Sequence, residues 1–120
     1  MEWEVLISEE YAKWFNGLPQ KHKVAIAIDL QVLKDVGPLL GRPHADQIKG
    51  SKFNNLKELR TKVSGRIYRS LFAFDPERKA VILCGGDKKG KNQEKFYQKL
   101  IVQAEAIFDK HLKNIQTQWR

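Results

Sequence analysis

The chain has 120 residues, of which 42% are hydrophobic and 30% charged, a composition typical of a soluble globular domain with its own core. Its single cysteine, Cys84, excludes a disulfide framework and a cysteine-rich metal site. The N-terminus is acidic and polar, and no apolar run reaches the length of a membrane span. We therefore expect a single domain over residues 1–120, located in the cytoplasm.

The formal net charge of +8 is concentrated in one part of the chain. Residues 1–41 carry four basic and six acidic groups, a net of −2, and residues 92–120 carry five and three, a net of +2. Residues 42–91 carry thirteen basic and five acidic groups, a net of +8. Such a localised field favours a polyanionic partner, nucleic acid first, although general solubility is an alternative explanation.

The first two predicted elements are short. Trp3–Ile7 is an apolar run that predicts a strand, and Ser8 is a suitable cap for a helix over Glu9–Gly17. This helix has acidic residues in its first turn and directs Trp14 and Phe15 inward.

A second helix is predicted over Gln20–Val36, opened by Pro19 and ended by Gly37. Its expected buried face consists of Ala25, Ile28, Val32 and Val36, joined by Ile26 and Leu33. The following residues 37–55 are rich in glycine and proline and have little periodicity. A connection of that length in a small domain is usually functional or mobile.

Three strands follow, at Leu56–Val63, Arg66–Phe74 and Lys79–Cys84. Turns at residues 64–65 and 75–78 join them into an antiparallel meander. The last element is a helix from Asn92 to about Leu112, with residues 113–120 as a loose tail. Its apolar stripe contains Tyr97, Ile101, Ala104, Phe108 and Leu112, widened by Leu100 and Ile107.

The order of these elements is β-α-α-β-β-β-α, which predicts an α+β fold. We expect a small antiparallel-rich sheet with two N-terminal helices and a C-terminal helix, the helices packing on one face of the sheet.

Residues 85–91, Gly-Gly-Asp-Lys-Lys-Gly-Lys, match the P-loop pattern of nucleotide-binding proteins. The next residue is Asn92, where that motif needs a Ser or Thr hydroxyl for magnesium. The glycines also follow the last strand, so no later strand can complete a parallel sheet with an acidic magnesium ligand. We expect no nucleotide cofactor. A helix start rich in lysines can still attract the phosphate of a polymer.

A metal site is not expected, because His22, His44 and His111 are scattered without metal-ligand spacing. What the basic region offers is a set of cations with tyrosines: Lys49, Lys52, Lys57, Arg60, Arg66, Tyr68, Arg69, Lys88, Lys89, Lys91 and Tyr97.

Strand alternation predicts which of these residues share a face of the sheet. Glu58 and Arg60 share one face of their strand, and on the next strand Arg66 and Tyr68 lie opposite to Arg69. Because Arg69 has apolar neighbours on its own face, it is either paired with a carboxylate, for which Glu58 is the candidate, or set in a concave site.

Such a set of residues can cleave RNA. The reaction requires that the ribose 2′-hydroxyl be deprotonated, the pentacoordinate phosphate stabilised and the leaving oxygen protonated. Arginine forks suit the phosphate oxygens, a lysine crowded by like charges can act as a base, and a tyrosine can donate a proton.

Three sequence pieces carry a resemblance to a known family: Leu56-Lys57-Glu58-Leu59-Arg60, Gly65-Arg66-Ile67-Tyr68-Arg69, and Gly85-Gly86-Asp87-Lys88-Lys89-Gly90 ahead of Phe96-Tyr97. Gln47-Ile48-Lys49-Gly50 resembles the leucine-lysine-glycine segment that precedes these pieces in the same family. In order and spacing, over about residues 3–112, the chain resembles the RelE/HigB toxins of bacterial type II toxin–antitoxin modules, in particular the phage-derived HigB-like branch.

The resemblance implies an mRNA endonuclease that acts in the ribosomal A site, needs no metal and is silenced by a cognate antitoxin, expected to be a helix-turn-helix protein. By motif position it implies catalytic roles for Arg60, Arg69, Lys88 and Tyr97, with Arg69 binding the phosphate. The other members of the set are expected to bind RNA: Lys49, Lys52, Lys57, Arg66, Tyr68, Lys89 and Lys91.

The chain departs from the family at two points. Glu58 stands where the best-known RelE enzyme has a lysine, and the histidines of some HigB enzymes have no clear match. The candidates for the base are therefore Lys88 and Lys57. Two other functions are alternatives: a toxin of the same fold that poisons DNA gyrase, and a non-catalytic module that binds nucleic acid. The enzyme hypothesis requires that the mid-chain cations converge on one hollow.

Overall fold

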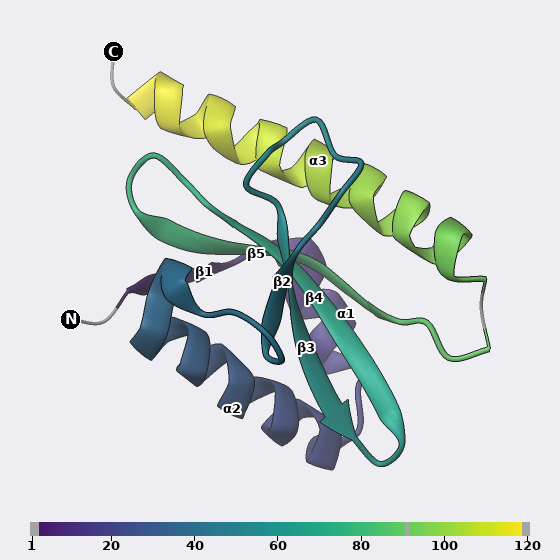
Figure 1. The fold of residues 1–120 in the computed structure, drawn as a ribbon. Coiled ribbons are helices and arrows are strands. Elements are labelled where there is room, and N and C mark those ends of the chain that lie inside the picture. The colour runs from purple at the N-terminus through teal and green to yellow at the C-terminus, as the bar shows by residue number, and fades with distance from the viewer. Residues whose placement is uncertain (1–2, 91, 119–120) are drawn as a thin grey trace.

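The computed structural model describes residues 3–90 and 92–118, which form a five-stranded sheet with helices packed against it (Figure 1). The elements are β1 Glu4–Ile7, α1 Glu9–Asn16, α2 Gln20–Val36, the 3₁₀ turn η1 Gly37–Leu39, β2 Ala45–Gln47, β3 Lys57–Val63, β4 Arg66–Phe74, β5 Lys79–Asp87 and α3 Gln93–Gln118.

The strand order in the sheet is β1-β5-β4-β3-β2. β1 runs parallel to β5, whereas the β2–β3, β3–β4 and β4–β5 pairs are antiparallel. The predicted α+β fold with an antiparallel-rich sheet is confirmed. The sequence analysis missed β2, because three residues paired with β3 from Ala45 opposite Leu59 are too few to show an alternating pattern.

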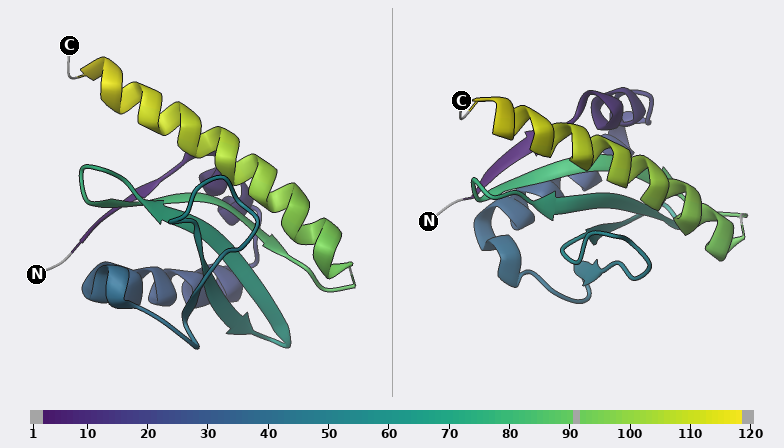
Figure 2. Two further views of the ribbon diagram at one scale, coloured as in Figure 1. Left: turned by 45° about the horizontal axis from the view of Figure 1, so that its top comes forward. Right: turned by 90° about the horizontal axis from the view of Figure 1, so that it is seen from above.

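The helices cover both faces of the sheet, so the prediction that they pack on one face is wrong. Leu71 and Leu83 lie in a core cluster with α3, whereas Phe72 and Ile82 lie in a second cluster with Tyr11 of α1 and residues of α2. Neighbouring residues of a strand point to opposite faces, and in this sheet both faces are apolar. Figure 2 shows α3 and α2 on opposite sides of the sheet.

The face of α2 that packs on the sheet differs from the predicted face. Ile26 and Leu33 are fully buried as expected, but Ile28 is 60% exposed and Val36 is 43% exposed. The helix carries apolar residues over more than one face, and helical periodicity alone cannot tell which of them the sheet covers.

Local signals fixed the ends of the helices correctly at two points. The Ser8 hydroxyl accepts a hydrogen bond from the Tyr11 N–H at 3.0 Å and donates to the Leu83 carbonyl at 2.7 Å, so it caps α1 and ties the helix to β5. Gly37 ends α2 with φ of 74°, and a Cβ there would lie 2.1 Å from Nε1 of Trp3. Only glycine fits this position.

β5 and α3 are longer than predicted. β5 continues past Cys84 to Asp87, and α3 continues past Leu112 to Gln118. The loop before β3 crosses α3 (Figure 1) and is held there by Phe53, whose ring packs edge-on against Phe108 with centroids 4.9 Å apart. None of the helices in the described residues has the length and apolar character that crossing a membrane requires.

Candidate functional site

Antiparallel register brings the candidate residues of β3 and β4 onto one face. Arg60 lies directly opposite Arg69, and Glu58 lies opposite Leu71, which belongs to the core cluster under α3. Directly opposed residues point to the same side of a sheet. Glu58, Arg60 and Arg69 therefore face α3, which contributes Tyr97.

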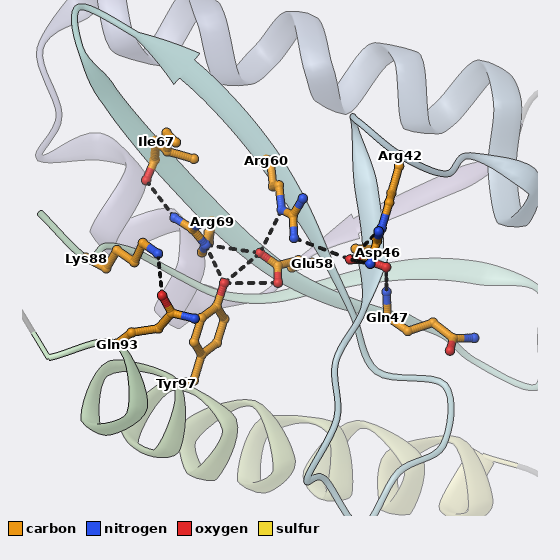
Figure 3. A network of polar contacts seen from close by, with 10 residues as sticks. All are labelled: Arg42, Asp46, Gln47, Glu58, Arg60, Ile67, Arg69, Lys88, Gln93 and Tyr97. Carbon is orange, nitrogen blue, oxygen red and sulfur yellow. Dashed lines mark hydrogen bonds and ion pairs between the residues drawn. The ribbon is translucent and has the colours of Figure 1, made fainter.

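Glu58 is the centre of this polar network (Figure 3). Its Oε1 lies 3.1 Å from Nε of Arg69 and 3.3 Å from Nε of Arg60, and the Tyr97 hydroxyl donates to its Oε1 and Oε2 at 2.9 and 3.1 Å. Nε of Arg69 also donates to the Tyr97 oxygen, and its Nη1 to the Ile67 carbonyl at 3.4 Å. Of the two alternatives for Arg69, the carboxylate partner is the one observed.

Burial makes the Glu58–Arg69 pair the best shielded part of the network. Their side chains are 5% and 7% exposed, whereas the Arg60 side chain is 31% exposed. Removing one member of such a buried ion pair is strongly destabilising, because it leaves the other charge buried without compensation.

Tyr97 is a neutral phenol at physiological pH. Burial, followed by the charge of Glu58, raises its pKa from 10.0 to about 12. The Arg69 guanidinium, centred 5.7 Å from the Tyr97 ring, opposes that shift only in part. Tyr97 therefore keeps its proton and donates hydrogen bonds to Glu58, while it accepts one from Arg69.

An open pocket of about 470 Å³ lies beside this network. Asp46 of β2 forms part of its wall and accepts hydrogen bonds from Nε of Arg42 at 3.0 Å and from Nη2 of Arg60 at 3.4 Å. The hydrogen bond from Arg42 is the main reason that the pKa of Asp46 is lowered. The pocket is lined by Arg42, Asp46, Gln47, Ile48, Lys49, Glu58, Arg60, Gln93 and Tyr97.

Lys88 reaches the edge of the same region. Its Nζ donates to Oε1 of Gln93 at 2.9 Å, and Gln93 lines the pocket one turn before Tyr97 on α3 (Figure 3). Arg60, Arg69 and Lys88 therefore lie around one region of the surface and not on separate surfaces. Of the residues predicted to bind RNA, Lys49 also lines this pocket.

Other candidates lie elsewhere. Lys57 precedes Glu58 on β3 and points to the opposite face, where its Nζ donates to the Pro38 carbonyl at 3.1 Å. Lys57 therefore lies on the other side of the sheet from the Glu58 network, and its predicted role as the base finds no support in this geometry. Tyr68 is 4% exposed on the same opposite face, with its hydroxyl 2.6 Å from Nδ1 of His22.

Two of the remaining cations form ion pairs away from the Glu58 network. Lys52 forms an ion pair with Asp109 on α3, and Arg66 forms one with Asp87. Arg66 and Lys89 line a separate pocket beside α1. Lys91, the last predicted RNA-binding residue, lies outside the described residues.

Two glycines of the 85–91 stretch, Gly85 and Gly86, have a packing role. Gly85 and Gly86 belong to β5 and not to a loop. A Cβ at Gly85 would lie 2.4 Å from the Trp14 ring, and one at Gly86 would lie 2.9 Å from the Phe96 ring. Two aromatic rings thus rest directly on the backbone, which explains the glycine pair without a nucleotide.

The sequence analysis did not single out Arg42, Asp46 or Gln93. Arg42 and Asp46 are four residues apart in a segment without periodicity, and their ion-pair spacing is the one signal that could have drawn attention to them. Gln93 carries no sequence signal, because its part in the site depends on where α3 begins. Within residues 3–90 and 92–118, no group of three or more His, Cys, Asp or Glu side chains could hold a metal ion.

Comparison with known proteins agrees with this architecture. The model of the phage-derived Gp49-like protein family matches residues 13–109. Two relatives from Mycobacterium tuberculosis are similar: putative toxin HigB2, 39% identical over 105 residues, and putative toxin HigB3, 40% identical over 93 residues. The alignments cover 87% and 78% of this chain. The chain spans about half the length of HigB2, 52%, and 79% of HigB3.

Two solved structures share the fold at low sequence identity. A mutant of the E. coli toxin RelE in the free state matches with a TM-score of 0.61 and 14% identity, covering 85% of this chain and 96% of RelE. A chain of the archaeal RelE–RelB complex from Pyrococcus horikoshii matches with a TM-score of 0.55 and 19% identity, and the match covers 77% of this protein and 100% of that chain. The fold is thus that of RelE, and the chain belongs to the phage-derived Gp49-like family, within the HigB-like branch of the RelE/HigB toxin family.

Proposed function

We propose that this protein is the toxin of a type II toxin–antitoxin module and cleaves mRNA on the ribosome, in the cytoplasm, without a metal ion. The observation that carries the proposal is the network in which Arg60, Arg69 and Tyr97 surround Glu58 beside an open pocket. The similarity to two putative toxins supports the toxin assignment. The RelE–RelB complex supports a cognate antitoxin as the partner.

The proposed reaction is an internal transesterification. The ribose 2′-oxygen loses its proton and attacks the adjacent phosphorus, while the bond from phosphorus to the 5′-oxygen of the next nucleotide breaks. The 5′-oxygen takes up a proton. The products are a 2′,3′-cyclic phosphate and a 5′-hydroxyl end, so atoms and charge balance without a cofactor.

The two arginines stabilise the negative charge of the phosphate. Arg60 is the more accessible of the two, with 31% of its side chain exposed against 7% for Arg69. Arg60 therefore meets the incoming phosphate first, and Arg69 acts from behind it in a drier environment. Charge stabilisation by fixed donors in a site shielded from water is commonly the largest contribution to catalysis.

Tyr97 and Glu58 are suited to the two proton transfers. Tyr97 holds its proton at neutral pH and protonates the leaving 5′-oxygen. Glu58 lines the pocket and is the carboxylate next to that tyrosine, so it accepts the proton of the 2′-hydroxyl. This replaces Lys57 as a candidate base, and Lys88 remains a cation for the RNA backbone on the same side.

The test is inducible expression of the chain in bacteria with mapping of mRNA 5′ ends. Growth arrest together with new mRNA 5′ ends at codons that ribosomes occupy supports the proposal. Arg60→Ala is expected to abolish the growth arrest and the cleavage. Lys62→Ala, at an exposed position on β3, is the matched control and is expected to leave cleavage intact.

Two other results would contradict the proposal. Growth arrest with broken chromosomes and intact mRNA would identify a gyrase poison on the same scaffold. If expression causes no arrest and the purified chain binds RNA without cutting it on ribosomes, the chain is a binding module.

A further inference from the structure

A long groove runs between α1 and α3, separate from the Glu58 pocket. It consists of three adjoining hollows of about 450, 520 and 330 Å³. The first two share Trp14, Gly85 and Gln103, and the last two share Glu10 and Ile107. None of the residues that line this α1–α3 groove lines the Glu58 pocket, so the groove is a second feature of the surface.

One wall of the groove is an open strand edge. β1 pairs with β5 only from Lys79 to Ile82. Beyond that point, the Ser8 hydroxyl donates a hydrogen bond to the Leu83 carbonyl. Residues 84–86 of β5 pair with β4 on one side but have no strand partner on the other within the described chain. An open edge of this kind is a template for one more strand.

The sides of the groove are mostly apolar. Trp14 of α1 packs on Gly85, and Phe96 of α3 packs on Gly86, so two aromatic residues flank the open edge. Leu18 and Leu100 extend the apolar lining at this end, and Ile107 extends it at the other. Apolar side chains that alternate along an added strand would be buried between α1 and α3.

The charges along the groove differ at its two ends. Lys89, Lys99 and Arg66 line the end beside Gly86, although Arg66 is paired with Asp87. Glu9 and Glu10 line the far end, together with Lys110 of α3. A continuous phosphate backbone would meet these carboxylates, whereas a peptide can place its acidic residues at the lysine end only.

We propose that the α1–α3 groove binds an extended peptide segment of a second protein, which adds a strand to the open edge of β5. The segment has alternating apolar side chains and carries acidic side chains at the end that lies beside Lys89 and Lys99. This inference does not depend on RNA cleavage, because it uses no residue of the Glu58 pocket.

The test uses a phage-displayed library of random 12-residue peptides, selected against the full chain. We expect enriched peptides that combine β-branched or aromatic residues with an acidic end. A synthetic copy of the best peptide is expected to slow amide hydrogen exchange at residues 84–86. Its affinity is expected to fall about tenfold or more in the Lys89→Glu/Lys99→Glu double variant, a loss of roughly 1.4 kcal/mol or more.

Lys62→Glu, an exposed charge reversal on β3 at a residue that does not line the groove, is the control and is expected to leave peptide affinity within about twofold, because salt screens charges outside the contact. The inference is wrong if no peptide is enriched, or if the enriched peptides slow exchange elsewhere. It is also wrong if single-stranded RNA, and not peptide, protects residues 84–86. None of these outcomes changes the result of the 5′-end mapping, so the two proposals fail separately.

Discussion

Tyr97 on α3 and Glu58 on β3, 39 residues apart, are joined by hydrogen bonds from one phenol to both carboxylate oxygens at 2.9 and 3.1 Å. This contact links α3 to β3 across the sheet face and places a neutral phenol beside two arginines. The contribution of the Tyr97 hydroxyl can be tested separately from that of its ring, because Tyr97→Phe removes the hydroxyl alone.

Tyr97→Phe is expected to reduce mRNA cleavage about 100-fold, the usual effect of losing one general acid, while the ring and its packing on Phe96 are kept. The measurement is single-turnover cleavage of mRNA on ribosomes. Gln98→Ala, at an exposed position on the same helix, is the control. Cleavage by Tyr97→Phe at the wild-type rate would show that the hydroxyl donates no proton.

Glu58→Ala is expected to destabilise the fold by about 3 kcal/mol, because it leaves the Arg69 guanidinium buried without its counter-charge. Urea denaturation followed by circular dichroism measures the loss. Asp46→Ala removes the partner of Arg42 and Arg60 at a position where 22% of the side chain is exposed, against 5% for Glu58, and is expected to change stability little. Equal effects of the two substitutions would mean that burial adds nothing to the Glu58 pair.

The fold is expected to lose stability as the pH rises above 10. Burial raises the pKa of Tyr11 from 10.0 to about 12, so between these values the unfolded chain has released a proton that the folded chain retains. Unfolding is then favoured by up to about 1.4 kcal/mol per pH unit for this group.

Burial also raises the pKa of Cys84, to about 12, so this thiol adds to the same alkaline loss from about pH 9 upwards. Tyr97, whose pKa is also raised to about 12, contributes to the same loss, and thermal denaturation between pH 8 and pH 11 measures the sum. Tyr11→Phe removes one contribution and is expected to flatten the curve above pH 10, although it also loses the 2.8 Å hydrogen bond to Ser70 at every pH. An unchanged alkaline slope in this variant would contradict the assignment.

Gly85→Ala is expected to destabilise the fold by roughly 1–3 kcal/mol, since the added Cβ would lie 2.4 Å from the Trp14 ring. Chemical denaturation of the variant measures this loss. Gly41→Ala is the control, because nothing lies within 4 Å of a Cβ there. A Trp14→Leu background is expected to relieve part of the cost of Gly85→Ala. If both glycine variants are equally stable, the ring does not rest on the β5 backbone.

The sequence predicted the three long strands because their turns and apolar runs are local features. Alternation also predicted correctly that Arg69 lies on the face opposite to Tyr68, a geometric consequence of the pleat. It did not predict the α2 face, where Ile28 is exposed and Ile26 buried, because two apolar stripes compete and only the sheet selects one.

The glycine pair shows the same division. A Gly-Gly pair before a helix is compatible with a phosphate-binding loop and also with a strand packed under aromatic rings. In the structure the pair belongs to β5 and lies under the rings of Trp14 and Phe96. The distinction depends on Trp14, which is 71 residues before Gly85 in the sequence. No local sequence pattern predicts the contact between the Trp14 ring and Gly85.

The sequence by itself determined the order of the longer elements, the cap at Ser8 and the concentration of positive charge in residues 42–91, because each of these depends on neighbours along the chain. Only the tertiary structure decided that Glu58 is the centre of the arginine and tyrosine network, that Lys57 points away from it, and that part of β5 is left as an open edge. These are properties of strand register and helix placement, which arise from packing between residues that are distant in the sequence.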